Sequence, residues 1–146
     1  MTLSRRGGVS YAQNQADIRA EILRYASLNG YPASHFADAV CTCGATLFAL
    51  KLDDAAGAAV RRCVSCTHEH AMGDSADFLP NAHLEECACP CGGEQLEITT
   101  GVSVYDGSED VRWLYIGCRC PACALTAVYG DWKNEGEGYR GFLARV

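Results

Sequence analysis

Hydrophobic positions in the first forty residues predict one amphipathic helix. Ser10, followed by Gln13 three residues later, matches a capping box at the start of a helix. Apolar residues then recur at helical spacing, at Ile18, Ile22 and Tyr25. Asn29, Gly30 and Pro32 predict its end. Residues 34 to 40 predict a short second helical turn before the first cysteine pair.

A different pattern follows, in which short apolar runs alternate with turn residues. Residues 46 to 52 and 58 to 63 predict a hairpin around the turn formed by Asp53, Asp54 and Gly57. Residues 67 to 72 predict a third strand. Residues 73 to 86 are acidic and contain Pro80, so this connector is the predicted boundary between two modules.

The second half repeats the strand pattern with longer runs. Leu96, Ile98, Thr100, Val102 and Val104 would share one face of a strand. Asp106 and Gly107 begin the next turn. The run VRWLYIGCRC predicts a strand that leads back to the cysteines, and LTAVYGDW predicts the strand that follows the last cysteine pair. The spacing of apolar residues in the tail predicts a short amphipathic helix with Tyr139, Phe142, Leu143 and Val146 on one face.

Cysteine usage changes this picture. Each of the ten cysteines has another cysteine within three residues, which favours metal binding over a disulfide framework. The opening residues MTLSRRGGVSYAQNQ contain no apolar stretch typical of a signal peptide, so a reducing, cytoplasmic location is expected. No run of about 18 apolar residues occurs, so a membrane span is not expected.

The spacing of the cysteines predicts two sites of four thiolates. Each unit opens with CxCG, at 41–44 and 89–92, and returns through a hairpin to a CxxC pair after 19 or 28 intervening residues. Gly-Asp follows seven residues after the last cysteine in both units, which indicates an internal repeat. We therefore predict two closed structural Zn²⁺ sites per chain, with ligands Cys41, Cys43, Cys63 and Cys66 in the first and Cys89, Cys91, Cys120 and Cys123 in the second.

The cysteine segments resemble the cysteine knuckles of zinc-ribbon and rubredoxin-like proteins. One copy consists of CTCG and CVSC, and the other of CPCGG and GCRCPAC. The resemblance covers about 41 to 74 and 87 to 131, and the Trp113 and Tyr115 region with YGDWK is similar to uncharacterised bacterial ribbon proteins. It implies a ribbon fold that binds zinc, or iron in the rubredoxin branch, and no single activity.

Several residues near the cysteines have open roles. Cys87 and Cys118 each precede a predicted ligand by two residues, so they are interpreted as buried thiols, with alternative ligation, a reversible disulfide or redox sensing as alternatives. For His68 and His70, a packing or surface role is favoured over metal binding. Arginines lie next to cysteines of both units in the sequence, at Arg61, Arg62 and Arg119. We interpret their positive charges as compensation for the negative thiolates.

The sequence as a whole predicts a small, metal-stabilised α+β protein. Residues 1–40 form a helical segment, 41–74 a first zinc-ribbon-like antiparallel module, 75–86 a connector, and 87–146 a second such module with a C-terminal helix. A four-thiolate site has no open coordination position, so we expect no enzyme activity.

The expected function is a non-catalytic protein-interaction or regulatory module with another protein as partner. The formal net charge of −6 disfavours binding to a phosphate backbone, so a nucleic-acid-associated ribbon is the weaker alternative. The other alternative is a rubredoxin-like iron electron carrier or a thiol redox sensor. The oligomeric state stays open.

Overall fold

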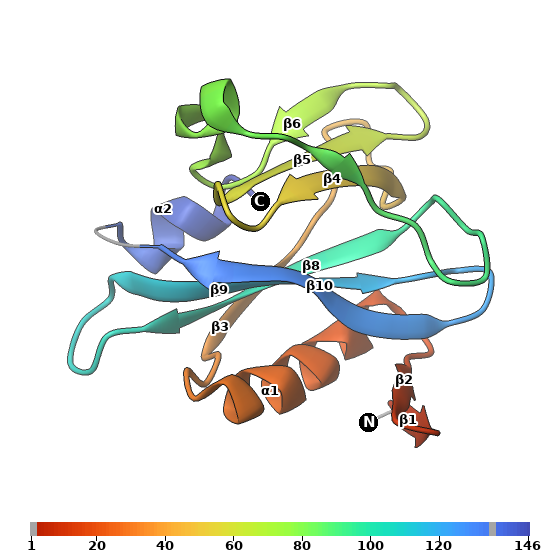
Figure 1. Cartoon of the computed structure of the whole chain (residues 1–146), viewed down its shortest axis with the longest axis horizontal. Helices are drawn as coiled ribbons and strands as arrows, with labels where there is room; N and C mark the ends of the chain where they lie inside the picture. The colour runs from red at the N-terminus through yellow and green to blue at the C-terminus, as the bar shows by residue number, and fades with distance from the viewer. Residues whose placement is uncertain (1–2, 135–136) are drawn as a thin grey trace.

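Two antiparallel sheets and a long helix form three layers in the computed structural model (Figure 1), which describes residues 3–134 and 137–146. The large sheet has the strand order β1-β2-β10-β9-β8-β3. Its strands are β1 (Ser4–Arg6), β2 (Val9–Tyr11), β3 (His35–Asp38), β8 (Glu97–Val104), β9 (Val111–Arg119) and β10 (Leu125–Lys133). The small sheet has the order β6-β5-β4-β7. Its strands are β4 (Phe48–Asp53), β5 (Ala58–Cys63), β6 (Glu69–Ala71) and β7 (Glu85–Glu86).

Helix α1 (Ile18–Asn29) covers the outer face of the large sheet. Ile18 and Ile22 are fully buried there, as the helical spacing predicted. The helix packs closely because glycines lie beneath it: a Cβ on Gly117 would be 2.6 Å from Ile18, and one on Gly101 would be 2.8 Å from Ile22. The predicted end is also confirmed, since Gly30 caps the helix in a left-handed conformation, with φ 87°.

The predicted capping box at Ser10 is wrong. Ser10 lies in β2, pairs with Thr126 of β10, and donates its hydroxyl to Glu21 at 2.5 Å. The helical region begins later, with a 3-10 turn, η1 (Gln15–Asp17), whose cap is the Asn14 side chain accepting from the Asp17 N–H at 3.1 Å. The edge of β10 gives Ser10 a tertiary partner that local sequence could not show.

The helical turn predicted over residues 34 to 40 is also wrong. This segment forms β3, which pairs with β8 from His35 opposite Val102 to Asp38 opposite Thr99. The Ser34 N–H extends the pairing by donating to the Val102 carbonyl at 2.8 Å. The free edge of β8 supplies backbone partners along this whole segment, and this outweighs its weak helical preference.

The predicted strands after each CxCG segment are confirmed. In the small sheet β4 pairs with β5 and β5 with β6, and in the large sheet β9 pairs with both β8 and β10. In strand β8 the residues predicted to share one face are not the only buried ones. Both of its faces are buried, because α1 covers one and the small sheet covers the other.

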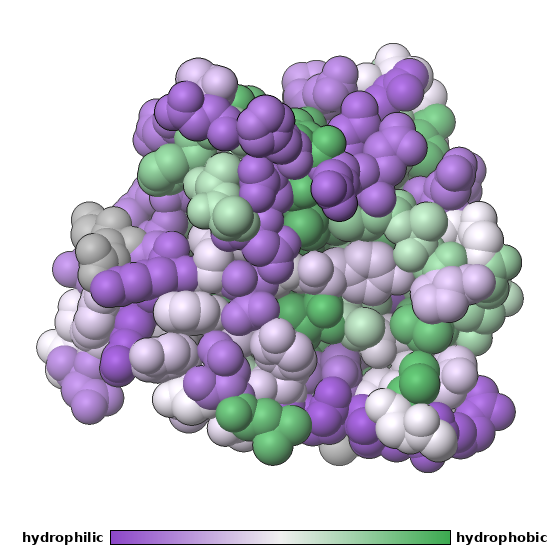
Figure 2. All heavy atoms as spheres, viewed as in Figure 1, coloured by the Kyte–Doolittle hydropathy of each residue, from purple (hydrophilic) through white to green (hydrophobic). Residues whose placement is uncertain are grey.

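The main hydrophobic core lies between the two sheets. It joins side chains from the first cysteine unit, such as Phe48 and Leu50, to side chains of the large sheet, such as Ile98 and Leu114. The predicted C-terminal helix is confirmed as α2 (Tyr139–Leu143), and it closes the core with Phe142. Figure 2 shows hydrophilic residues over most of the visible surface and hydrophobic atoms between the layers.

The acidic segment from 73 to 86 contains two short 3-10 turns, η2 (Ser75–Asp77) and η3 (Leu79–Asn81), and then β7. Strand β7 pairs with β4, with Glu86 opposite Lys51 and Glu85 opposite Leu52. The acidic segment therefore covers part of the β4 edge. Within the described residues, no helix combines the length and the apolar character that a bilayer crossing requires.

Candidate metal centres

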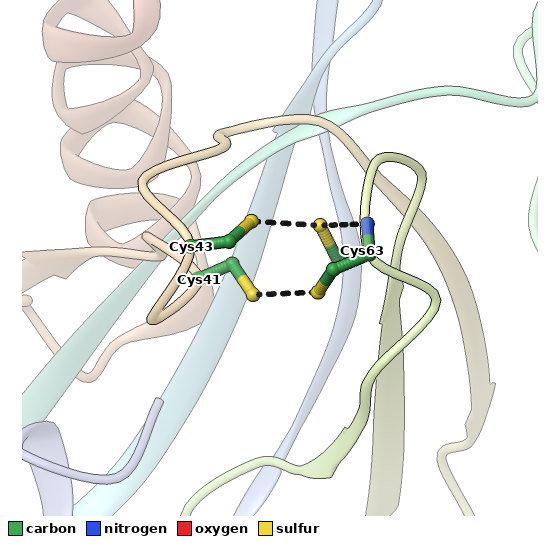
Figure 3. Close-up of side chains that lie close together, drawn as sticks. Cys41, Cys43 and Cys63 are labelled. Carbon is green, nitrogen blue, oxygen red and sulfur yellow. Dashed lines mark hydrogen bonds between the residues drawn. The ribbon is translucent and has the colours of Figure 1, made fainter.

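The first cysteine group gathers four sulfurs from two turns beside the small sheet (Figure 3). Cys41 and Cys43 lie in the turn before β4, whereas Cys63 ends β5 and Cys66 follows it. The Sγ atoms of Cys41 and Cys66 are 3.5 Å apart, and those of Cys43 and Cys63 are 3.6 Å apart. All four sulfurs lie within 4.8 Å of one another.

The second group has the same arrangement at one end of the large sheet. Cys89 and Cys91 precede β8, while Cys120 and Cys123 lie in the turn between β9 and β10. Their Sγ atoms are 3.4 Å apart for Cys89 and Cys123 and 3.7 Å apart for Cys91 and Cys120. The structure thus brings all eight predicted ligands together, in the two predicted groups of four.

These distances identify the kind of site. A disulfide would place two sulfurs about 2.05 Å apart. A tetrahedral ion with metal–sulfur bonds of about 2.3 Å places its sulfurs about 3.8 Å apart. The observed separations of 3.4 to 3.7 Å are close to the edge of that tetrahedron, so each group could hold one metal ion. None of the ten cysteines forms a disulfide.

The two CxCG turns have the same backbone geometry. Gly44 and Gly92 adopt left-handed φ values of 92° and 95°, which glycine reaches without steric cost. In each turn the glycine N–H donates to the carbonyl of the first cysteine at 2.8 Å. The first cysteine in turn donates its N–H across the turn, from Cys41 to Ala45 and from Cys89 to Gly93.

The two CxxC turns also match each other. Cys63 and Cys120 accept at their carbonyl oxygens from the N–H four residues later, at 3.0 and 2.7 Å. The donors, Thr67 and Ala124, are the non-glycine residues with positive φ in the described chain, at 65° and 69°. Each CxxC turn therefore includes one non-glycine residue in the left-handed backbone conformation, which is strained.

Backbone N–H groups favour the thiolate form at several of these cysteines. The N–H of Cys43 is the main cause that lowers the pKa of Cys41 to about 6, and the N–H of Gly93 lowers that of Cys91 to about 7. Burial instead raises the pKa of Cys89 to about 12. Metal ligation requires thiolates, so the N–H groups help to prepare each site for a cation.

The expected charge compensation occurs at the first group through one arginine. Arg61 is buried, with 6% of its surface exposed, and lies over the ring of Phe48 at 4.6 Å. Burial lowers its pKa, and the nearby thiolates of Cys41 and Cys63 oppose that shift. Arg119 does not serve the second group, because it binds the Ala12 carbonyl and the Glu97 carboxylate, both at 2.6 Å.

The remaining sequence candidates lie outside both sulfur groups. His68 is exposed, and His70 shares a hydrogen bond with the Arg145 carbonyl at 2.6 Å. Cys118 is fully buried and Cys87 is half-buried. Burial raises the pKa of Cys87 to about 11 and that of Cys118 well above its ordinary value. Burial thus favours the neutral thiol form at both residues, and the interpretation as a buried thiol fits Cys118 better than Cys87.

Sequence reasoning missed three positions that shape the turns. Thr67 and Ala124 occupy a conformation that usually takes glycine, so their residue types gave no signal. Gly93 had a signal in the doublet of CPCGG. A Cβ at Gly93 would be 2.9 Å from the sulfur of Cys120, so a side chain there would press into the second group.

The fold and the two sulfur groups define a small α+β protein with two four-cysteine groups suited to metal ions. Comparisons with protein families, with characterised proteins and with solved structures found no match to this chain.

Proposed function

We propose that this protein binds two Zn²⁺ ions at closed structural sites and acts without catalysis as a protein-interaction or regulatory module. The observation that supports it is the pair of four-sulfur groups, each with two sulfur–sulfur separations of 3.4 to 3.7 Å and all four sulfurs within 4.8 Å, which fits one tetrahedral ion each. Four protein thiolates fill the coordination sphere of zinc, so no position is left for water or substrate. The matched turns make the two sites zinc-ribbon-like.

The role of the metal follows from where the turns lie. Each group ties the segment before a hairpin to the far end of the same hairpin, and Cys41, Cys63, Cys89 and Cys120 belong to the core cluster. Metal binding therefore also fixes the ends of β5 and β9. Structural zinc sites contribute folding free energy directly, since the unfolded chain has no preformed site.

Elemental analysis of protein purified without added metal tests the metal assignment. We expect about two zinc ions per chain, and native mass spectrometry should show both ions on one molecule. One ion, no ion, or a strong visible absorption from a ferric tetrathiolate would contradict the zinc proposal. The last result would instead support the rubredoxin-like electron carrier.

Exposed apolar residues beside the first group support a protein partner. Val40 directly precedes Cys41 and is 51% exposed, and Val64 directly follows Cys63 and is 37% exposed. Apolar side chains held at the edge of a rigid turn are suited to contact another protein. Acidic Glu85 and Glu86 lie on the β7 edge of the same small sheet.

A capture experiment with three baits tests this role. Wild-type protein, Val64→Asp, and Leu28→Asp serve as baits, because Leu28 is also exposed, at 77%, but lies on α1. We expect a protein captured by wild type and Leu28→Asp and lost with Val64→Asp or after metal removal. Capture that is equal for all baits, or no capture, would contradict the proposal.

A further inference from the structure

A cavity of about 660 Å³ lies at the end of β8 and β9 that is opposite the second cysteine group. Two segments form its wall, the chain between α1 and β3 and the tip of the β8–β9 hairpin, and both lie in the left half of Figure 1. Its volume is in the range of sites that hold small molecules. The side chains that give this wall its chemistry are Tyr31, Ser103, Tyr105 and Arg112.

A β-bulge places Arg112 in this wall. Ser103 pairs with Trp113, and the next pair joins Val104 to Val111, so Arg112 has no partner residue on β8. A bulge leaves one residue outside the pairing and changes the direction of its side chain. Arg112 therefore need not follow the regular alternation of β9.

Aromatic rings hold the redirected side chain in place. The ring of Tyr31 stacks on Trp113, with centroids 4.9 Å apart and planes 17° apart. The guanidinium carbon of Arg112 lies 4.3 Å from the centroid of Tyr31 and 5.5 Å from that of Tyr105. These cation–π contacts use the positive charge of Arg112 and leave its N–H donors available.

The donors of Arg112 have no acceptor within the protein. In the ranges that the structure describes, its side chain forms no ion pair and no hydrogen bond, although the residue is half-buried. Arg119 on the same strand differs, because it donates to the Ala12 carbonyl and the Glu97 carboxylate. The guanidinium of Arg112 is thus an ordered group with five N–H donors at the cavity.

A buried hydroxyl next to the bulge also lacks a partner. Ser103 is 4% exposed and lines the cavity, and among the described residues its Oγ forms no hydrogen bond. The atom is not sealed from solvent, since the fully enclosed polar atoms without a partner belong to other residues. A polar group this deep is favourable only when it is hydrogen-bonded, so the wall has a second donor for a ligand.

The charges of the wall limit the ligand further. Arg112 is its basic residue, so a cationic ligand is disfavoured. Of the two acids in the wall, Glu109 pairs with Arg140, with Oε1 and Nε 3.4 Å apart, and Asp106 is exposed in the hairpin turn. These carboxylates would repel a dianion such as phosphate more strongly than a monoanion. A planar carboxylate also matches the guanidinium through two parallel hydrogen bonds.

We propose that this cavity binds a single carboxylate group attached to a short apolar chain. Arg112 donates two N–H groups to the carboxylate and Ser103 donates its hydroxyl, while the apolar chain lies against Pro32 and Val104. The carboxylate can come from a small organic acid or from an acidic side chain of a polypeptide, and both present the same chemistry. This site uses no cysteine, so it extends the function beyond metal binding.

Binding is tested by NMR titration of the full chain at constant ionic strength. The separate probes are butyrate, its neutral isostere butyramide, Nα-acetyl-aspartate N-methylamide and inorganic phosphate. We expect saturable shifts of the Arg112 Nε–H and Ser103 amide signals with a carboxylate probe. Saturation by butyrate identifies a free organic acid, whereas saturation by the capped aspartate alone identifies a polypeptide side chain. Equal shifts with butyramide, tighter binding of phosphate, or no saturation at millimolar concentration would overturn the proposal.

Two cavity variants and one matched control decide whether the named residues bind the carboxylate. Arg112→Lys keeps the charge and removes the planar fork, and Ser103→Ala removes the hydroxyl. Arg6→Lys is the control, because Arg6 also lies over a tyrosine ring, 4.2 Å from the centroid of Tyr11, but is outside the cavity.

We expect about a tenfold loss of affinity for Arg112→Lys, because the bidentate hydrogen bond is lost, and roughly a threefold loss for Ser103→Ala. Arg6→Lys should bind as wild type. Unchanged binding by Arg112→Lys, or an equal loss in all three variants, would overturn the proposal. Amide spectra that are unchanged away from the cavity show that the variants remain folded.

Discussion

Gly73 leaves no room for a side chain against Phe142. A Cβ on Gly73 would be 2.6 Å from two carbons of the phenyl ring, well inside van der Waals contact. Gly73 also has a left-handed φ of 62°, and its N–H donates to the Arg145 carbonyl at 2.8 Å. The end of the first cysteine unit is thus held directly against α2, which packs on the core.

Gly73→Ala should therefore lower stability by more than its backbone conformation alone explains. We expect a loss of about 2 to 4 kcal/mol, of which about 1 kcal/mol comes from the left-handed backbone and the rest from displacing Phe142. Gly107→Ala is the matched control, since Gly107 has a φ of 69° and open space around it. Equal losses in denaturant unfolding would show that the contact with Phe142 is not restrictive.

Cysteine variants should separate the two metal centres. We expect Cys41→Ser and Cys89→Ser each to reduce the zinc content from two ions to one and to lower stability by several kcal/mol. The reason is that structural zinc in small domains contributes about 10 to 16 kcal/mol of binding free energy. Cys87→Ser should keep both ions, because Cys87 is outside both sulfur groups. Loss of an ion in Cys87→Ser would reassign the ligands.

Thr67→Gly should stabilise the protein. A β-branched residue in the left-handed region is strained, and glycine removes that strain at a smaller entropic cost, so we expect a gain of about 1 kcal/mol. Ser65→Gly in the same CxxC turn is the control, since the φ of Ser65 is not positive. It should instead lose about 0.5 to 1 kcal/mol. Thermal unfolding at constant zinc distinguishes the two, and a loss for both would contradict strain at Thr67.

Two aspartates should titrate in opposite directions from the ordinary value of 3.8. N–H groups, first that of His83 and then that of Ala56, lower the pKa of Asp53, whereas burial raises that of Asp74. The ionised form of Asp53 therefore stabilises the fold above pH 3.8, and this contribution is lost as the pH falls through its lower folded pKa. For Asp74 the sign reverses, and stability increases as the pH falls through its raised pKa.

Carbon-13 NMR of the side-chain carboxyl groups measures both titrations directly. The series is followed only while the amide spectrum shows an intact fold, because acid also protonates the metal-binding thiolates. At the lowest such pH, Asp53 should still be ionised while Asp74 is already partly protonated. The reverse order would show that the backbone donors do not reach Asp53.

Much of this protein was predictable because its signals are local. Each hairpin is an alternating run between turn residues, and these runs became β4 with β5 and β8 with β9. The α1 spacing of Ile18 and Ile22 predicted the buried face of a helix. The grouping of the eight cysteines also followed from local rules, since two cysteines on one tight turn need only a hairpin to meet a second pair.

The two wrong predictions have one physical cause. Ser10 and the 34–40 segment have side chains that are compatible with a helix start or a helical turn, but both belong to strands of the large sheet, β2 and the edge strand β3. Strand β10 supplies the partner of Ser10, and β8 supplies that of His35. Both partners are more than sixty residues away in the chain, so no local pattern could reveal them.

The sequence by itself determined the strands of the two cysteine-flanked hairpins, the long helix and the sets of cysteines that meet, because these depend on residues that are near in the chain or repeated in the same order. Only the tertiary structure decided that the two cysteine units share one core and that their Gly-Asp pairs serve close packing. It also brought Tyr31 to the same cavity as Ser103 and Arg112. These relationships depend on how the two sheets and the long helix stack, and stacking is fixed by the fit of side chains from distant segments.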